Sequence, residues 1–349
     1  MLSDTSPESS TASASSGLDS YAKGQIAINS LSIIITTVPN SVSASENPSY
    51  SLLHDPEIAS QVSSLLRDPN SGAGDNNLCR WLYDTFQSSD PNLQLVVLRY
   101  LPIIAGVYLS RVALRRPLAG FEAVLLALYA HETTSRAGQS WTVSVPDLSH
   151  PSLYHESRSS TKSNATEQNI AVVSPRLEPY GTVRSTKRAR IVGVALELYY
   201  SKIIYMPVRS KIEFCEFCET WAGQDGEMYK DGEEVDKGMQ QLRIDDAAGS
   251  ESVEKERDGE KVGRIPLPWE LLQPVLRILG HCLLGTGKDK DLFDAACRAC
   301  RSLYARSLHD INSKAILATG SLLRLAKMSS DSADDFEPPE ILNNNAITL

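Results

Sequence analysis

The sequence predicts a mainly α-helical protein of antiparallel helical pairs, in an α-solenoid-like or bundle arrangement with one small β-hairpin. Apolar residues recur at intervals of three and four along most of the 349 residues, which is the period of an amphipathic helix. Aspartate–proline pairs precede two of these stretches, as they do at helix N-termini. One region alternates apolar and polar residues with the two-residue period of a strand. The apolar content of 42% is enough to form a sizeable core.

The first helices are predicted between residues 31 and 87. Helical periodicity begins at Leu31, although the β-branched run from Ile33 to Thr37 also fits a short strand. Asp55 and Pro56 begin a clearer helix, whose apolar stripe ends before Asp68. The next apolar stripe is formed by Leu78, Trp81, Leu82 and Phe86.

A strongly apolar stretch from Leu93 to Leu114 follows a second helix start at Asp90 and Pro91. A helix that is apolar on all sides is a buried one. Because Pro102 removes one backbone hydrogen bond, we expect this helix to kink or divide there. Another helix is predicted from Leu118 to His131, and the short connection before it implies that the two are antiparallel neighbours.

The hairpin is predicted where the period of the sequence changes to two. Trp141, Val143 and Val145 alternate with polar residues before Pro146. The segment from Ile170 to Val173 is the expected pairing partner, across an intervening loop rich in serine, asparagine and threonine.

Helices are predicted again after the hairpin, which brings the expected total to roughly nine or ten. Proline and glycine residues mark the turns between them. The predicted stretches run from Lys187 to Tyr205, Ile212 to Trp221, Trp269 to Leu284, Lys290 to Leu308 and Ile311 to Ala326.

We expect the predicted helices to form a single helical domain at residues 25–327. An acidic segment at about residues 223–263 is nearly free of aromatic side chains and is expected to be a disordered insertion. Disorder is also expected for the serine-rich segment 1–24 and for the tail 328–349.

Charge and targeting signals narrow the function classes. The formal net charge of −9 argues against nucleic acid as a partner, because phosphate backbones require a basic surplus. Residues 1–20 have neither the basic nor the apolar region of a signal peptide, so we expect the chain in the cytosol. The apolar stretch from Ile26 to Val38 is too short and too polar to span a bilayer, so no direct transmembrane insertion is predicted.

Two Cys-x-x-Cys pairs raise a zinc hypothesis. Cys215 with Cys218 and Cys297 with Cys300 would supply four thiolates, a set suited to tetrahedral metal. Both pairs fall on predicted apolar helical stripes without a glycine-bearing knuckle, so burial of cysteine in the core explains them better than a metal does. We predict no metal and keep these four residues as the alternative.

Candidate catalytic residues and cofactor sites are not predicted. The six histidines are scattered, and none belongs to a metalloprotease or hydrolase motif. Two basic clusters, at residues 111–116 and 184–190, could face anionic lipid or could cover a solvated surface.

The end of the predicted first strand opens the motif Val145-Pro146-Asp147-Leu148-Ser149-His150-Pro151-Ser152-Leu153-Tyr154-His155-Glu156. This motif resembles the signature of the hyccin family. Shorter matches in the same order, from Leu98-Arg99-Tyr100-Leu101-Pro102 to Arg264-Ile265-Pro266, extend the resemblance over roughly residues 25–327. The motif residues, which we expect to have a structural or partner-binding role, are Pro146, Leu148, Ser149, Pro151, Tyr154, His155 and Glu156.

The resemblance implies a non-catalytic scaffold subunit rather than an enzyme. The implied partners are a tetratricopeptide-repeat scaffold protein, a phosphatidylinositol 4-kinase and a membrane-anchoring subunit. The complex would supply phosphatidylinositol 4-phosphate at the inner face of the plasma membrane, to which the chain would be recruited by its partners. The alternative is a zinc- or thiol-dependent protein that uses the paired cysteines.

Overall fold

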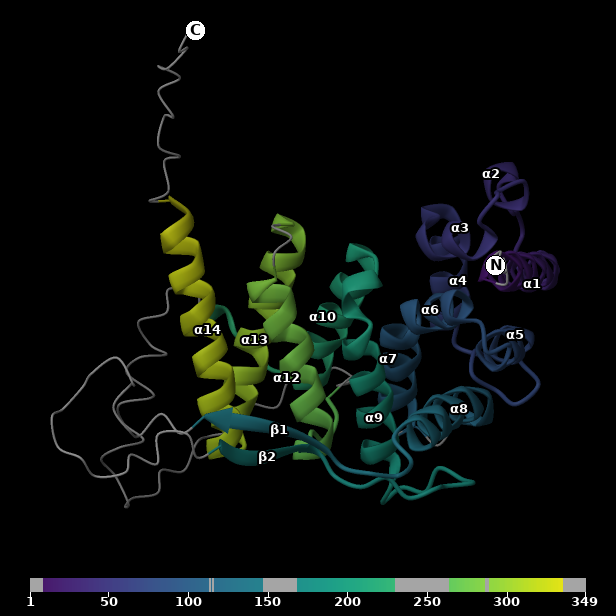
Figure 1. The fold of residues 1–349 in the computed structure, drawn as a ribbon. Helices are drawn as coiled ribbons and strands as arrows, with labels where there is room; N and C mark the ends of the chain where they lie inside the picture. Colours follow the sequence, from purple (N-terminus) through teal and green to yellow (C-terminus); the bar gives the residue numbers. More distant parts are fainter. Residues whose placement is uncertain are drawn as a thin grey trace, which may run out of the picture.

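The computed structural model describes residues 9–112, 114, 116–146, 168–229, 264–285 and 289–334. Figure 1 shows helices packed side by side from α1 at one end to α14 at the other, with a β-hairpin beside the last helices. One continuous hydrophobic core runs from Ala27 on α1 to Ala326 on α14. The predicted helical architecture with one small hairpin is confirmed.

Side-chain caps mark the starts of the helices that begin at Pro48, Pro56 and Asn77. The Asp55 carboxylate accepts a hydrogen bond from the Ile58 N–H at 2.8 Å, which confirms the predicted helix start. Asn47 caps a shorter helix, unpredicted because it is a single apolar patch rather than a repeating stripe. The helices are α1 (Ser9–Leu31), α2 (Asn40–Ser43), α3 (Pro48–His54), α4 (Pro56–Arg67) and α5 (Asn77–Gln87).

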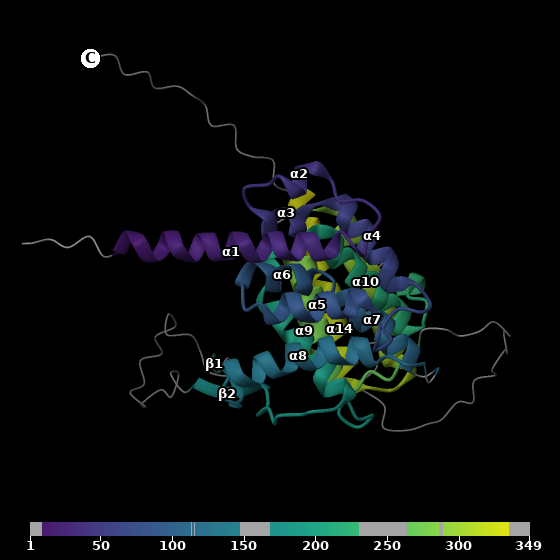
Figure 2. The same ribbon diagram turned by 90° about the vertical axis from the view of Figure 1, so that its right-hand side faces the viewer.

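The predicted boundary at residue 25, between a disordered N-terminal segment and the helical domain, is wrong. Helix α1 starts at Ser9, so residues 9–24 are helical where disorder was expected, and Leu31 is the last residue of the helix rather than the first. Its anchor is its C-terminal end, where Ile28 and Leu31 are buried and the Ala27 carbonyl accepts a hydrogen bond from the Trp81 indole. Figure 2 shows the other end of α1 projecting from the body.

The apolar stretch after Asp90 is divided, as Pro102 predicted. Helices α6 (Pro91–Arg99) and α7 (Leu101–Val112) meet at a bend of 44°. Within the ranges given above, no single helix is long and apolar enough to cross a membrane, whereas α6 and α7 taken together satisfy the length and composition criteria. Both helices contribute buried side chains to the core.

Helix α8 (Ala119–Ser135) does not pack mainly against the preceding helix, although the sequence predicted that the two would be neighbours. It packs mainly on α5 and α9 (Arg188–Ser201) rather than against α7. The Gly120 N–H donates a hydrogen bond to the Gly72 carbonyl at 2.8 Å, which fixes the start of α8 near α5. A short connection therefore does not make α7 and α8 packed partners.

The hairpin is confirmed. Strand β1 (Trp141–Pro146) pairs antiparallel with β2 (Gln168–Ser174), and Val143 lies opposite Ala171. Val143, Ile170 and Val172 are all exposed, so the apolar side chains of the hairpin are not fully used by the core.

The C-terminal helices follow the predicted order. Helix α13 packs between α10 and α14, and α12 packs on α9. Because α14 continues to residue 334, the predicted start of the disordered tail at 328 is wrong for its first residues. The elements after α9 are η1 (Ile203–Tyr205), α10 (Val208–Ala222), η2 (Glu227–Tyr229), α12 (Trp269–Leu284), α13 (Lys290–His309) and α14 (Ser313–Asp334).

The first residues of the predicted acidic insertion belong to the described structure. Residues 223–229 are ordered against α13, where the Tyr229 ring meets Tyr304 edge-on at 5.0 Å. Residues 230–263 lie outside the described ranges. The Ile265 N–H donates to the Trp221 carbonyl at 3.3 Å, so the chain returns to the core where it left it.

Candidate functional site

The hyccin-like motif starts at the end of the hairpin. Pro146 is the last residue of β1, opposite Gln168 at the start of β2. The other motif residues, Leu148, Ser149, Pro151, Tyr154, His155 and Glu156, lie outside the described residues. Their predicted role therefore stays a prediction.

Three of the four paired cysteines meet in the core between α10 and α13. Cys215 and Cys218 on α10 and Cys300 on α13 are completely buried, and a fourth thiol, Cys282 on α12, is hydrogen-bonded to Cys215. Cys297 is half-buried, one turn away from Cys300 on α13. The Cys-x-x-Cys spacing pointed to Cys297 and missed Cys282, because Cys282 stands alone in its helix.

The pKa values of the four paired cysteines are raised, which keeps their thiols protonated. Burial is the main reason why the pKa of Cys218 lies well above its usual range, and nearby Cys300 adds to the effect. Burial also raises the pKa of Cys297 to about 11. Metal ligation and nucleophilic attack both require the thiolate. In the part of the chain that the structure describes, no three His, Cys, Asp or Glu side chains are placed to hold a metal ion.

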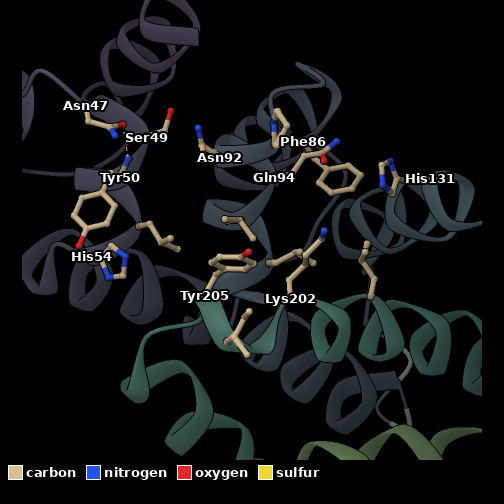
Figure 3. Close-up of a pocket in the computed structure, with 16 residues that line it drawn as sticks. Asn47, Ser49, Tyr50, His54, Phe86, Asn92, Gln94, His131, Lys202 and Tyr205 are labelled. Atoms are coloured by element: carbon tan, nitrogen blue, oxygen red, sulfur yellow. Dashed lines mark hydrogen bonds between the residues drawn. The ribbon is translucent and has the colours of Figure 1, made fainter. Parts of the chain in front are cut away.

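A groove of about 690 Å³ lies between α3, α6, α8 and the end of α9. Figure 3 shows Tyr50 and His54 of α3 on one side, His131 of α8 on the other, and Lys202 and Tyr205 between them. Tyr50 and Tyr205 are 59% and 54% exposed, so large aromatic surfaces face solvent at the edge of the groove. The groove was not predicted, because it joins segments that are far apart in the sequence.

Ring contacts hold the two histidines of the groove. The His54 ring lies 4.3 Å from Tyr50, and the His131 ring meets Phe86 edge-on at 5.3 Å. Burial and the nearby Arg99 lower the pKa of His54, so its imidazole is neutral at pH 7. Lys202 is the one lysine, arginine, aspartate or glutamate among the described residues that line this groove. Exposed aromatic rings over apolar walls, with few charges, are typical of surfaces that bind protein side chains.

The two basic clusters make contacts within the chain. Arg111 donates to the Ser71 hydroxyl at 2.9 Å and to the Arg67 carbonyl at 2.8 Å. Arg188 donates to the Tyr108 hydroxyl at 3.0 Å, and Arg190 donates to the Pro175 carbonyl at 2.9 Å. These arginines join helices to one another and to loops, which favours the structural interpretation over the lipid-binding one.

The comparison with known protein families agrees with the motif. The family model described as Hyccin matches residues 43–343. The chain belongs to the hyccin family. Its membership supports a non-catalytic scaffold role in a type III phosphatidylinositol 4-kinase complex. The hyccin match includes every residue that lines the groove, the cysteines between α10 and α13, and all of the motif residues.

Proposed function

We propose that this chain is a scaffold subunit that binds a tetratricopeptide-repeat protein and stabilises a phosphatidylinositol 4-kinase complex at the inner face of the plasma membrane. In this role it supports phosphatidylinositol 4-phosphate synthesis without catalysing it. The hyccin match over residues 43–343 carries the proposal, because it covers the whole body from α3 to α14.

The continuity of the core supports a scaffold role. Side chains from α1 to α14 belong to one hydrophobic cluster, which packs the described helices against one another. A partner bound at the groove near α3 is then held at a fixed position relative to a partner bound near α14. Fixed spacing is what a scaffold contributes to a complex.

In this proposal, a membrane-anchoring subunit recruits the chain from the cytosol to the membrane. The helices whose composition comes nearest to a membrane span are α6 and α7. Ile103, Ile104 and Tyr108 on α7 are fully buried in the core of the body, where they contact protein. This packing supports attachment through partners rather than insertion of the chain itself.

Removal of the chain from cells tests this function. We expect the kinase to leave the plasma membrane and the local signal of a phosphatidylinositol 4-phosphate reporter to fall, because the complex loses a subunit that holds it together. Both should be measured by fluorescence microscopy, with re-expression of the wild-type chain as the control. Unchanged kinase localisation and reporter signal after complete removal would contradict the proposal.

A further inference from the structure

The guanidinium of Arg277 on α12 is held between two aromatic rings. It lies 4.6 Å from the centre of the Trp141 ring on β1 and 4.2 Å from the centre of the Tyr200 ring on α9. Both distances are within the range of cation–π contacts. The hairpin, α9 and α12 thus position this side chain together.

The hydrogen-bonding capacity of Arg277 is unused. Its Nη1 atom is buried without an acceptor, and the guanidinium makes no hydrogen bond or ion pair with any residue that the structure describes. Arg136, which faces the same Trp141 ring at 5.6 Å, pairs with Glu132 at 2.6 Å and Glu197 at 3.1 Å. An arginine keeps its charge at any physiological pH, and leaving a buried donor unpaired is costly. Among the residues that the structure describes, Arg277 therefore has no anionic partner of the kind that Arg136 has.

Arg277 lines a pocket of about 580 Å³, and none of its described lining residues is acidic. His281 lines the same pocket one turn further along α12, and its pKa is lowered by burial and by nearby Lys211. Val173 of β2 closes one side of the pocket, and Figure 1 shows the hairpin beside α12 and α14. The apolar lining residues include Leu276, Leu284, Ala318 and Leu322. The pocket therefore presents the positive charge of Arg277 surrounded by apolar side chains.

We propose that this pocket binds an acidic side chain of the tetratricopeptide-repeat partner, whose carboxylate accepts hydrogen bonds from Arg277. The inference rests on the proposed function, since it names the surface that meets that partner. The guanidinium fork matches the two oxygens of a carboxylate. Trp269 and Leu284 at the pocket are 41% and 46% exposed, and they contact the apolar residues that flank the acid in the partner.

Charge reversal at Arg277 tests the inference. The full-length chain and the purified tetratricopeptide-repeat protein of the same organism are mixed, and Kd is measured by titration calorimetry. We expect Arg277→Glu to weaken binding by roughly 30-fold or more, because it replaces the attraction with repulsion in a desolvated site. The matched control is Arg80→Glu on α5, where Arg80 is 83% exposed and distant from the pocket lining. Its Kd should stay within about twofold of wild type.

The results of this titration distinguish failure of the pocket assignment from failure of the scaffold function. Wild-type binding that Arg277→Glu leaves unchanged overturns the pocket assignment while the scaffold function stands. A wild-type chain that shows no binding overturns the scaffold function, and the assignment with it. Thermal unfolding by circular dichroism checks each variant. If Arg277→Glu does not fold, the neutral Arg277→Gln variant is measured instead, and a Kd equal to that of wild type overturns the assignment.

Discussion

Replacement of Gly193 by alanine is expected to lower the free energy of unfolding by about 2–3 kcal/mol. Gly193 lies on α9 where this helix packs on α12. A Cβ atom at this position would lie 2.4 Å from the Glu270 carbonyl oxygen, in the first turn of α12. Because that oxygen belongs to the backbone, the two helices must separate to make room. The measurement is urea unfolding followed by circular dichroism.

The matched control is Gly280→Ala on α12. A Cβ atom there would lie 3.4 Å from Leu322 Cδ2, which is ordinary contact with a flexible side chain. Alanine is the better helix former, so we expect Gly280→Ala to leave stability unchanged or raise it by up to about 1 kcal/mol. Equal effects of the two variants would show that α9 and α12 do not pack closely at Gly193.

The second large effect is expected for Arg306→Met, which should lower the free energy of unfolding by about 3 kcal/mol or more. Arg306 on α13 is 8% exposed. It donates to the Ala222 carbonyl at 3.1 Å and the Ile265 carbonyl at 3.4 Å, and it pairs with Asp310. Methionine fills similar space but leaves both buried carbonyls without their donor. Arg306 thus joins the two ends of the segment that leaves the core after α10.

Arg298→Met on the same helix is the control for this prediction. Arg298 is 45% exposed and pairs with Glu219 at 3.3 Å. Exposed ion pairs contribute little, so a loss of less than about 1 kcal/mol is expected. The same urea titration compares both variants, and equal losses would mean that the contacts of Arg306 with the two carbonyls do not stabilise the fold.

Helices with a local start signal and a repeating apolar stripe could be predicted from the sequence. Asp90 is an example, since its carboxylate accepts hydrogen bonds from the Asn92 and Leu93 N–H groups at the start of α6. The start of α1 could not be predicted, because its polar N-terminal residues carry no apolar period and the helix is anchored only near Leu31. The sequence therefore predicted a helix start where a capping side chain and the apolar stripe next to it are enough to determine that start.

The candidate sites depend on contacts that are distant in the sequence. Tyr50 and Tyr205 share a groove only because α3 packs beside α6 and α6 lies near η1. Arg277 shows no signal in the sequence, since an arginine on an amphipathic helix is ordinarily solvated. Its contacts with Trp141 and Tyr200 depend on the positions of β1 and α9, which only the fold sets. The paired cysteines are the opposite case, because their spacing in the sequence does give a signal. The Cys-x-x-Cys spacing suggested a metal site, but burial of these side chains in the core also accounts for it.

The most direct test of the scaffold role is affinity isolation of the tagged full-length chain from an extract that contains cytosol and membranes. After washing at moderate salt, the bound proteins are identified and quantified by mass spectrometry. We predict recovery of a tetratricopeptide-repeat protein together with a phosphatidylinositol 4-kinase, in amounts comparable to the chain. Their repeated absence, from an extract shown to contain both, would contradict the scaffold function.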